Sequence, residues 1–201
     1  MTVNVNGTEI HLKFSFVFVL TLMLLFCQQD IIIVCVLSSM LHEGGHIVFM
    51  KLFGEGILSA TFGAFGVRIE RRNKCSLSYI KEGVIALGGI IINILLAFLG
   101  VIYYYLMKNQ QALMFSIINL LIALFNCIPI NLLDMGRALR CFLLMRYDED
   151  KTDRALNIIS LVFVNITAFV CVIYSAFVNI NPSFIAVTVY LYIITLFKKW
   201  S

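Results

Sequence analysis

Charged residues are scarce in this sequence. Lysine, arginine, aspartate and glutamate make up 13% of its 201 residues, whereas hydrophobic residues make up 61% and the mean hydropathy is +0.98. A soluble domain carries about a quarter charged residues and about half apolar ones. The composition therefore excludes an ordinary soluble fold and predicts an integral membrane protein. Because no polar stretch is long enough for a separate module, we expect one domain over residues 1–201.

The sequence also lacks paired cysteines and a basic cluster of the kind that binds nucleic acid. None of the six cysteines stands in a CxxC spacing, and all except Cys75 lie in apolar runs. This pattern is typical of small packing residues, and it argues against a disulfide framework or a cysteine zinc site. The basic residues lie between apolar runs, so we expect them to report membrane topology and predict no nucleic-acid partner.

Apolar runs separated by polar connectors predict about six transmembrane helices. The runs cover residues 14–27, 31–53, 84–107, 112–128, 155–178 and 183–197. No small-x-small cleavage site follows the first run, so we interpret it as a retained helix and not as a signal peptide. The fourth run stops at Pro129, and a helix restarts over 132–145.

Two parts of the chain do not fit a helical span. Residues 1–13 are polar and predict an interfacial lead into the first span. Between the second and third spans, glycines punctuate short β-prone pieces at 57–62 and 65–69, which predict a small membrane-associated β-hairpin or sheet. The predicted fold class is therefore an all-α polytopic membrane protein with this β element after its second helix.

The basic residues give an orientation. With six spans and a cytoplasmic N-terminus, only Lys108 of the 15 lysines and arginines falls on the outer side. Short cytoplasmic loops carry an excess of basic residues. We therefore predict a multi-pass protein of the cell membrane with both termini in the cytoplasm.

The second apolar run contains His42-Glu43-Gly44-Gly45-His46. On a helix, residues four apart share a face, so the two imidazoles can bind one Zn²⁺. Glu43 is then placed to take a proton from water on the metal, as in metalloproteases with this motif. The alternative is a chance pattern. However, the ionisable groups cost about 3 kcal/mol at membrane depth, and each helix-interior glycine costs about 1 kcal/mol, which a purely structural helix has little reason to keep.

A catalytic zinc takes three protein ligands and keeps one open position. His11, the remaining histidine, lies in the N-terminal lead. Of the eleven acidic residues, only Glu43 and Asp134 belong to otherwise apolar stretches, so Asp134 is the candidate third ligand. The alternative is that Asp134, just after a proline break, caps the restarted helix. Both roles can coexist because a carboxylate has two oxygens.

At these residues the chain resembles the site-2 protease family of intramembrane zinc metalloproteases, with a core over about 31–145 and extra helices at 14–27, 155–178 and 183–197. The family's HExxH motif corresponds to His42–His46. A later Asn-x-x-Pro and Leu-Asp-Gly motif is similar to the run from Asn126 to Gly136, and a degenerate Gly-Pro-x-x-Asn signature is similar to Gly89-Ile90-Ile91-Ile92-Asn93. The chain departs from the family pattern at four positions. Ile90 replaces the expected proline, Asn131 and Leu132 stand where prolines are usual, and Met135 replaces the first glycine after the aspartate.

The resemblance implies one Zn²⁺ bound by His42, His46 and Asp134, with Glu43 activating water. It also implies that Asn93 and Asn126 support the substrate backbone or the active-site helices, although ordinary interhelical hydrogen bonding is equally open. The chain is most similar to compact bacterial sporulation-type members, and we expect neither a PDZ nor a CBS module.

The implied function is hydrolysis of peptide bonds in or near the transmembrane segment of a membrane-tethered protein, in a bacterial plasma membrane. The implied substrate is a single-span membrane protein such as a pro-sigma factor, an anti-sigma factor or a signal-peptide remnant, and regulation would come from a membrane partner. Two alternatives remain: a membrane metal carrier or sensor, and a catalytically inactive relative.

Overall fold

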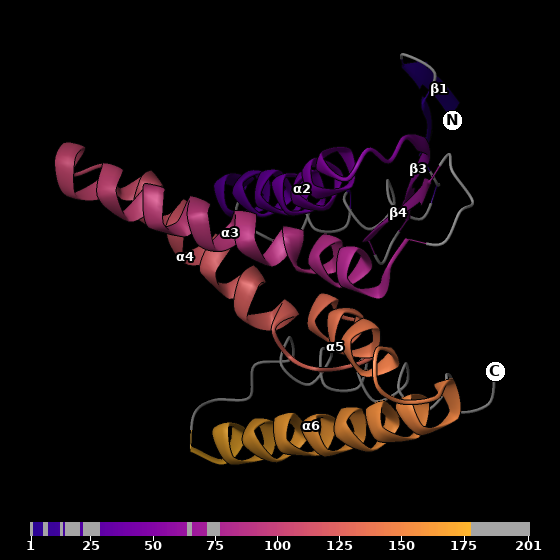
Figure 1. Cartoon of the computed structure of the whole chain (residues 1–201). Helices are drawn as coiled ribbons and strands as arrows, with labels where there is room; N and C mark the ends of the chain where they lie inside the picture. Colours follow the sequence, from indigo (N-terminus) through magenta and orange to yellow (C-terminus); the bar gives the residue numbers. More distant parts are fainter. Residues whose placement is uncertain are drawn as a thin grey trace. The chain divides into compact units, whose positions relative to one another are not determined.

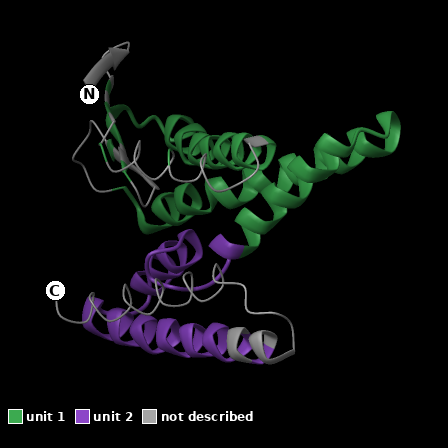
Figure 2. Ribbon diagram, turned by 180° about the vertical axis from the view of Figure 1, so that it is seen from behind, with its two compact units in different colours: residues 1–124 green, residues 125–201 purple. Residues whose placement is uncertain are grey.

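The computed structural model describes residues 2–5, 8–12, 14, 21, 29–63, 66–71 and 77–177. The predicted first span is described only at Phe14 and Thr21, and the predicted sixth span lies outside the described residues. The chain divides into two compact units, residues 1–124 and 125–201, which Figure 2 colours separately. Each unit is considered by itself below, and the prediction of one functional domain stays a prediction.

The described part of the chain is mostly helical. Three of its helices are long and apolar enough to cross a membrane, over Asp30–Leu52, Tyr79–Met107 and Glu149–Val170. A fourth apolar helix, Gln110–Asn126, is shorter. These helices support a membrane protein with several spans, while the count of six and the orientation of the termini stay predictions.

In the first unit, α2 (Gln29–Leu52) lies beside α3 (Tyr79–Met107), as Figure 1 shows. The third helix, α4 (Gln110–Asn126), follows a tight turn in which Lys108 adopts a left-handed backbone and ends α3. The Lys108 ammonium lies over the rings of Tyr104 and Tyr105. Tyrosine and lysine side chains of this kind are typical of a membrane–water interface.

The first unit also carries a four-stranded sheet in the order β1-β2-β3-β4. Its strands are β1 (Thr2–Val5), β2 (Thr8–Leu12), β3 (Ile57–Gly63) and β4 (Gly66–Arg71). Strand β2 pairs antiparallel with β1 and parallel with β3, and β3 pairs antiparallel with β4. The location of this sheet at the membrane surface stays a prediction.

The prediction of residues 1–13 as an interfacial lead did not include any strand, whereas β1 and β2 add two strands to the sheet; the interfacial location stays a prediction. The sequence contained a signal for this pairing. Valine, threonine and isoleucine alternate with polar residues on both sides of Asn6-Gly7, and an Asn-Gly dipeptide between such segments is the strongest short-range hairpin signal. The parallel pairing of β2 with β3 joins segments about 45 residues apart, which no local pattern predicts.

The second unit contains α5 (Asp134–Leu144) and α6 (Glu149–Phe177). Its apolar core forms around Ile130 and Val164, with Phe125, Ile128 and Leu133 packed against them. Helix α4 ends at Asn126, shortly before Pro129, and α5 begins at Asp134. The break and the helical restart therefore lie close to where the proline predicts them.

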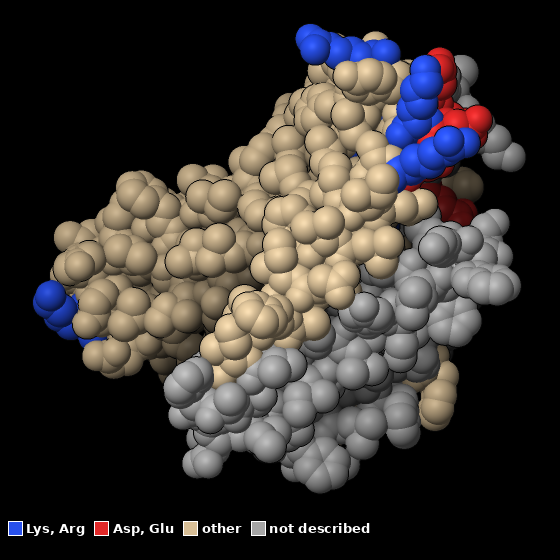
Figure 3. All heavy atoms as spheres, turned by 90° about the horizontal axis from the view of Figure 1, so that it is seen from below, with Lys and Arg blue, Asp and Glu red and all other residues tan. Residues whose placement is uncertain are grey.

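Large hydrophobic side chains are exposed along the helices. Phe98 of α3 is 63% exposed and Phe169 of α6 is 66% exposed. On the face drawn in Figure 3, charged side chains gather at the edges and the described surface between them carries none. Exposed apolar surface of this extent is unfavourable in water, and it suits contact with lipid.

Candidate metal centre

Helix α2 brings His42 and His46 together on one face. The two residues are one turn apart, and their rings lie with centroids 5.0 Å apart and planes at 85°. Both side chains are buried, with 6% and 9% of their surface exposed. Buried histidines in an apolar helix need polar partners, because an unsatisfied polar group costs free energy there.

Helix α3 orients one of the imidazoles. The Nδ1 atom of His46 lies 2.8 Å from the carbonyl oxygen of Ile85. A carbonyl oxygen only accepts, so Nδ1 must carry the ring proton and donate it. The Nε2 atom of His46 then keeps its lone pair for a metal. A hydrogen bond of this kind commonly fixes the tautomer of a histidine ligand.

Gly89 of α3 lies directly against the imidazole nitrogens. A Cβ atom on Gly89 would lie 2.6 Å from Nε2 of His42 and 2.7 Å from Nε2 of His46. Any side chain at position 89 would therefore collide with both rings. Because the two nitrogens lie close to one point, one ion can bind both, with zinc about 2.0–2.1 Å from each histidine nitrogen.

The two glycines of the motif have different surroundings. A Cβ on Gly45 would lie 2.6 Å from the carbonyl oxygen of Gly88, whereas a Cβ on Gly44 would meet nothing within 4 Å. Gly45 therefore allows the backbones of α2 and α3 to touch, as small residues do in membrane helix pairs. The sequence argument that the motif glycines lack a structural purpose was wrong for Gly45.

Asp134 is the first residue of α5 and is buried, with 6% of its surface exposed. The cap position belongs to Leu133, which makes no side-chain capping hydrogen bond. Asp134 is therefore not the N-cap residue that the alternative interpretation required. A carboxylate in the first turn still interacts favourably with the helix dipole.

Among the described residues, His42, His46 and Asp134 form a group that could hold a metal ion. Each offers one ligand atom, and all three side chains are buried. Two imidazoles and one carboxylate are a donor set that catalytic zinc sites use. Glu43 is half-buried and follows His42 directly on α2.

Asn93 has unusual surroundings for a buried amide. It lies one turn after Gly89 on α3, it is fully buried, and neither its Nδ2 nor its Oδ1 atom has a hydrogen-bond partner in the described part of the chain. Asn93 therefore makes no interhelical hydrogen bond within the described residues, although such a bond was the alternative role predicted for it from the sequence. An amide left without partners in a core is costly, which points to a ligand or water as its partner.

The interhelical role belongs instead to Asn119, which the motifs did not single out. Its Nδ2 donates to the hydroxyl of Ser38 at 2.9 Å and to the carbonyl oxygen of Phe115 at 2.8 Å, and Asn119 and Ser38 are both fully buried. Ser38 lies one turn before His42 on α2. An asparagine and a serine within apolar runs were the only available signal, and their pairing depends on how α4 meets α2.

The fold is similar to that of a solved structure, the site-2 protease from Methanocaldococcus jannaschii. The TM-score is 0.63 with 21% sequence identity, over 96% of this chain and 92% of that chain. No protein-family model and no curated protein matches the sequence. The similarity predicted from the motifs is therefore confirmed at the level of the fold.

Proposed function

We propose that this chain is an intramembrane zinc metalloprotease that cleaves peptide bonds in or near the transmembrane segment of a membrane-tethered protein. The observation that carries the proposal is the pair of buried imidazoles whose Nε2 atoms lie together against Gly89. The fold shared with a site-2 protease supports it over nearly the whole chain. The group of His42, His46 and Asp134 supports zinc as the ion.

In this proposal His42, His46 and Asp134 hold one Zn²⁺. Bound there, Zn²⁺ would supply Lewis-acid activation of water and of the scissile carbonyl. Glu43 accepts the proton of the attacking water and passes it to the leaving amine, as a general base and then a general acid. The carboxylates of Asp134 and Glu43 would together balance the charge of the ion.

Asn93 is a candidate for binding the substrate backbone. A primary amide offers two donors and one acceptor, which match the C=O and N–H groups of an extended peptide. The absence of any partner for its Nδ2 and Oδ1 atoms within the described residues supports this role over a purely structural one. Asn126, the last residue of α4, remains a candidate for the same role.

A substrate helix must unwind before cleavage, because its amides are already hydrogen-bonded within the helix. Strand addition to a sheet edge stabilises an extended peptide. From the sequence we expect the segment 54–80 to receive it, and within that segment β3 already pairs on both sides, with β2 and β4. The available edges belong to β1 and β4, and β4 is our proposed docking strand because it continues the segment that follows the metal helix.

The test is cleavage of single-span membrane proteins by the purified chain in detergent or vesicles. Candidate substrates are pro-sigma factors, anti-sigma factors and signal-peptide remnants in a bacterial plasma membrane, with a regulatory membrane partner added where cleavage needs one. We expect cleavage that stops with a zinc chelator and resumes with added zinc. Glu43→Gln should abolish cleavage while zinc stays bound at one ion per chain.

The same experiment separates the alternatives. A metal carrier or sensor would bind zinc and cleave nothing, and Glu43→Gln would leave its metal flux unchanged. An inactive relative would bind a single-span protein without cleaving it, with or without zinc. Cleavage that survives Glu43→Gln would contradict the general-base role of Glu43.

A further inference from the structure

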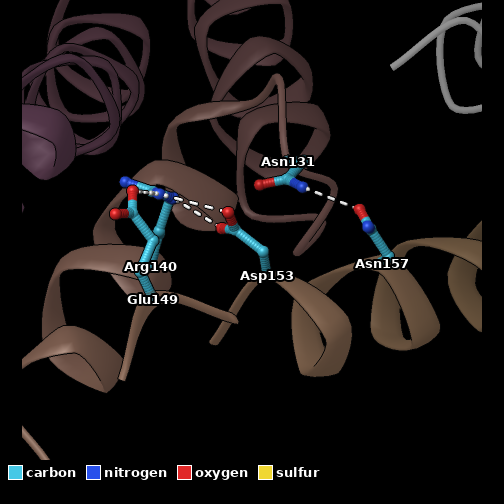
Figure 4. A network of polar contacts seen from close by, with 5 residues as sticks. All are labelled: Asn131, Arg140, Glu149, Asp153 and Asn157. Atoms are coloured by element: carbon cyan, nitrogen blue, oxygen red, sulfur yellow. Dashed lines mark hydrogen bonds and ion pairs between the residues drawn. The ribbon is translucent and has the colours of Figure 1, made fainter. Parts of the chain in front are cut away.

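The short connection before Asp134 departs from the family pattern at residue 131, where the chain has asparagine in a position usually taken by proline. The backbone N–H of Asn131 donates to the hydroxyl of Ser160 at 3.1 Å. Its side-chain Nδ2 donates to Oδ1 of Asn157 at 3.2 Å, as Figure 4 shows. Proline could make neither bond, because it lacks both the N–H and the amide.

Both acceptors lie on α6, on the side that faces the connection. Ser160 is 1% exposed, and Val164, one turn further on, belongs to the same apolar core as Ile130. Hydrogen bonds are strongest where water is excluded, so the Ser160 contact holds Asn131 firmly. Residue 131 is thus fixed to a long helix three residues before Asp134.

The other end of the connection is fixed by Gly136. A Cβ on Gly136 would collide with the carbonyl group of Ile130, so the first turn of α5 packs directly on the backbone of the connection. The Leu133 N–H also donates to the Ile130 carbonyl oxygen at 2.8 Å. Asp134 lies between two fixed points, residues 131 and 136, and its backbone has little freedom.

We infer that Asn131, Asn157 and Ser160 are positioning residues that set the Asp134 carboxylate for metal binding, doing by hydrogen bonds to α6 what a rigid proline would do by its ring. This inference rests on the proposed role of Asp134 as a zinc ligand. Helix α6 lies outside the core predicted from the motifs. Under this inference, α6 helps to position a proposed metal ligand. Groups hydrogen-bonded directly to a ligand are commonly worth 10–100-fold in metal affinity, and we expect partners that act through the backbone to lie at the lower end of that range.

The ion-pair cluster further along α5 does not carry the same role. Arg140 donates to Asp153 at 2.9 Å and to Glu149 at 2.7 Å, and about a third of its side chain is exposed. Exposed ion pairs contribute little, and their geometry is loose. The cluster lies two turns beyond Asp134, at the opposite end of α5 from Asn131.

The test measures the zinc dissociation constant of folded, purified protein by competition with a chelator. Asn157→Ala and Ser160→Ala should each weaken zinc about tenfold. The control is Asn165→Ala on the same helix, since Asn165 is exposed and donates to the Leu161 carbonyl of its own helix. Asn157→Asp keeps the acceptor oxygen and should restore affinity to within about twofold of the parent chain. A purely structural role would lower the melting temperature and leave the zinc affinity of the folded fraction unchanged.

Asp134→Asn is measured alongside and should weaken zinc most. If Asp134→Asn weakens zinc while Asn157→Ala and Ser160→Ala behave like Asn165→Ala, the positioning role is overturned and the proposed protease stands. If Asp134→Asn leaves zinc affinity unchanged, the ligand assignment fails and the positioning role fails with it. Should Ser160→Ala not fold, the difference between Asn157→Ala and Asn157→Asp still decides the outcome.

Discussion

The two regions that supply the proposed ligands are built in opposite ways. Around the histidines, α2 and α3 meet through glycines, so their backbones touch and the two imidazoles lie directly against Gly89. Around the aspartate, α5 and its preceding connection are tied to α6 by polar side chains, namely Asn131 with Asn157 and Ser160, and Arg140 with Glu149 and Asp153. The histidine region therefore depends on the absence of side chains at its glycines, whereas the aspartate region depends on hydrogen bonds between polar side chains.

This difference predicts which kinds of mutation each region tolerates. Packed interiors have no room for an added methyl group where two backbones touch. The histidine region should therefore fail when a side chain is enlarged. The aspartate region should fail mainly when a hydrogen-bonding group is removed, because the remaining partner stays buried without a bond.

The largest effect should come from Gly89→Ala. Its new Cβ would lie 2.6 Å from His42 Nε2 and 2.7 Å from His46 Nε2, so both rings would have to move from the positions in which they can bind one ion. We expect loss of stoichiometric zinc and at least about a hundredfold loss of cleavage, since both histidine ligands are affected. Metal analysis of the purified variant checks this directly. Full zinc occupancy in Gly89→Ala would place the ion elsewhere.

The next largest effect should separate the two motif glycines. Gly45→Ala brings a Cβ to 2.6 Å from the Gly88 carbonyl oxygen, so α2 and α3 must move apart, at a cost of about 1–3 kcal/mol. Gly44→Ala meets no neighbour within 4 Å and should be neutral or stabilising by up to about 1 kcal/mol, because alanine favours a helix.

Thermal unfolding of both glycine variants in the same detergent gives the measurement. Gly44→Ala acts as the matched control, since it adds the same methyl group to the adjacent residue of the same helix. Equal melting temperatures for the two variants would mean that the helices are not in backbone contact at Gly45.

Much of the metal site could be predicted from the sequence because its signals are local. Two histidines four residues apart share a helix face whatever surrounds them, and a proline in the interior of a helical run kinks or breaks the helix. Asp134 followed from the scarcity of acids in apolar runs. These features need no knowledge of how the helices meet.

The parts that the sequence did not reveal depend on pairs of segments. Gly89 matters because α3 crosses α2 at the histidines, and Asn119 matters because α4 meets Ser38. In the sequence, Asn157 and Ser160 are ordinary polar residues of a predicted extra helix, and only the fold shows that both accept hydrogen bonds from Asn131. The strand at Thr8–Leu12 had a local signal, but its parallel partner β3 did not.

A moderate effect should follow from separating Asn119 and Ser38, a buried polar side-chain pair between α4 and α2. Ser38→Ala removes the acceptor 2.9 Å from Nδ2 of Asn119 and leaves the Phe115 bond. Interhelical hydrogen bonds in membranes average about 0.6 kcal/mol, so we expect a small drop in melting temperature. Because Ser38 lies one turn before His42, zinc affinity measured together with stability tells whether the pair also sets the position of the metal helix.

The smallest effect should come from Arg140→Gln, which removes the ion pairs with Glu149 and Asp153. The hydrogen bond with Asp153 raises the pKa of Arg140 above its ordinary value, against the lowering effect of burial. A group with a raised pKa stabilises the folded state fully at pH values below its unfolded-state pKa, and this stabilisation is lost only as the pH rises through the folded-state pKa. Arg140 therefore stays charged across the working pH range, and a substitution is needed to test its ion pairs. Since exposed pairs are worth about 0–1 kcal/mol, we expect a slight loss of stability, reduced further at high salt, and zinc affinity within about twofold of the parent chain. A loss of zinc as large as that in Asn157→Ala would mean that the whole of α5, and not only its first turn, is held in register by α6.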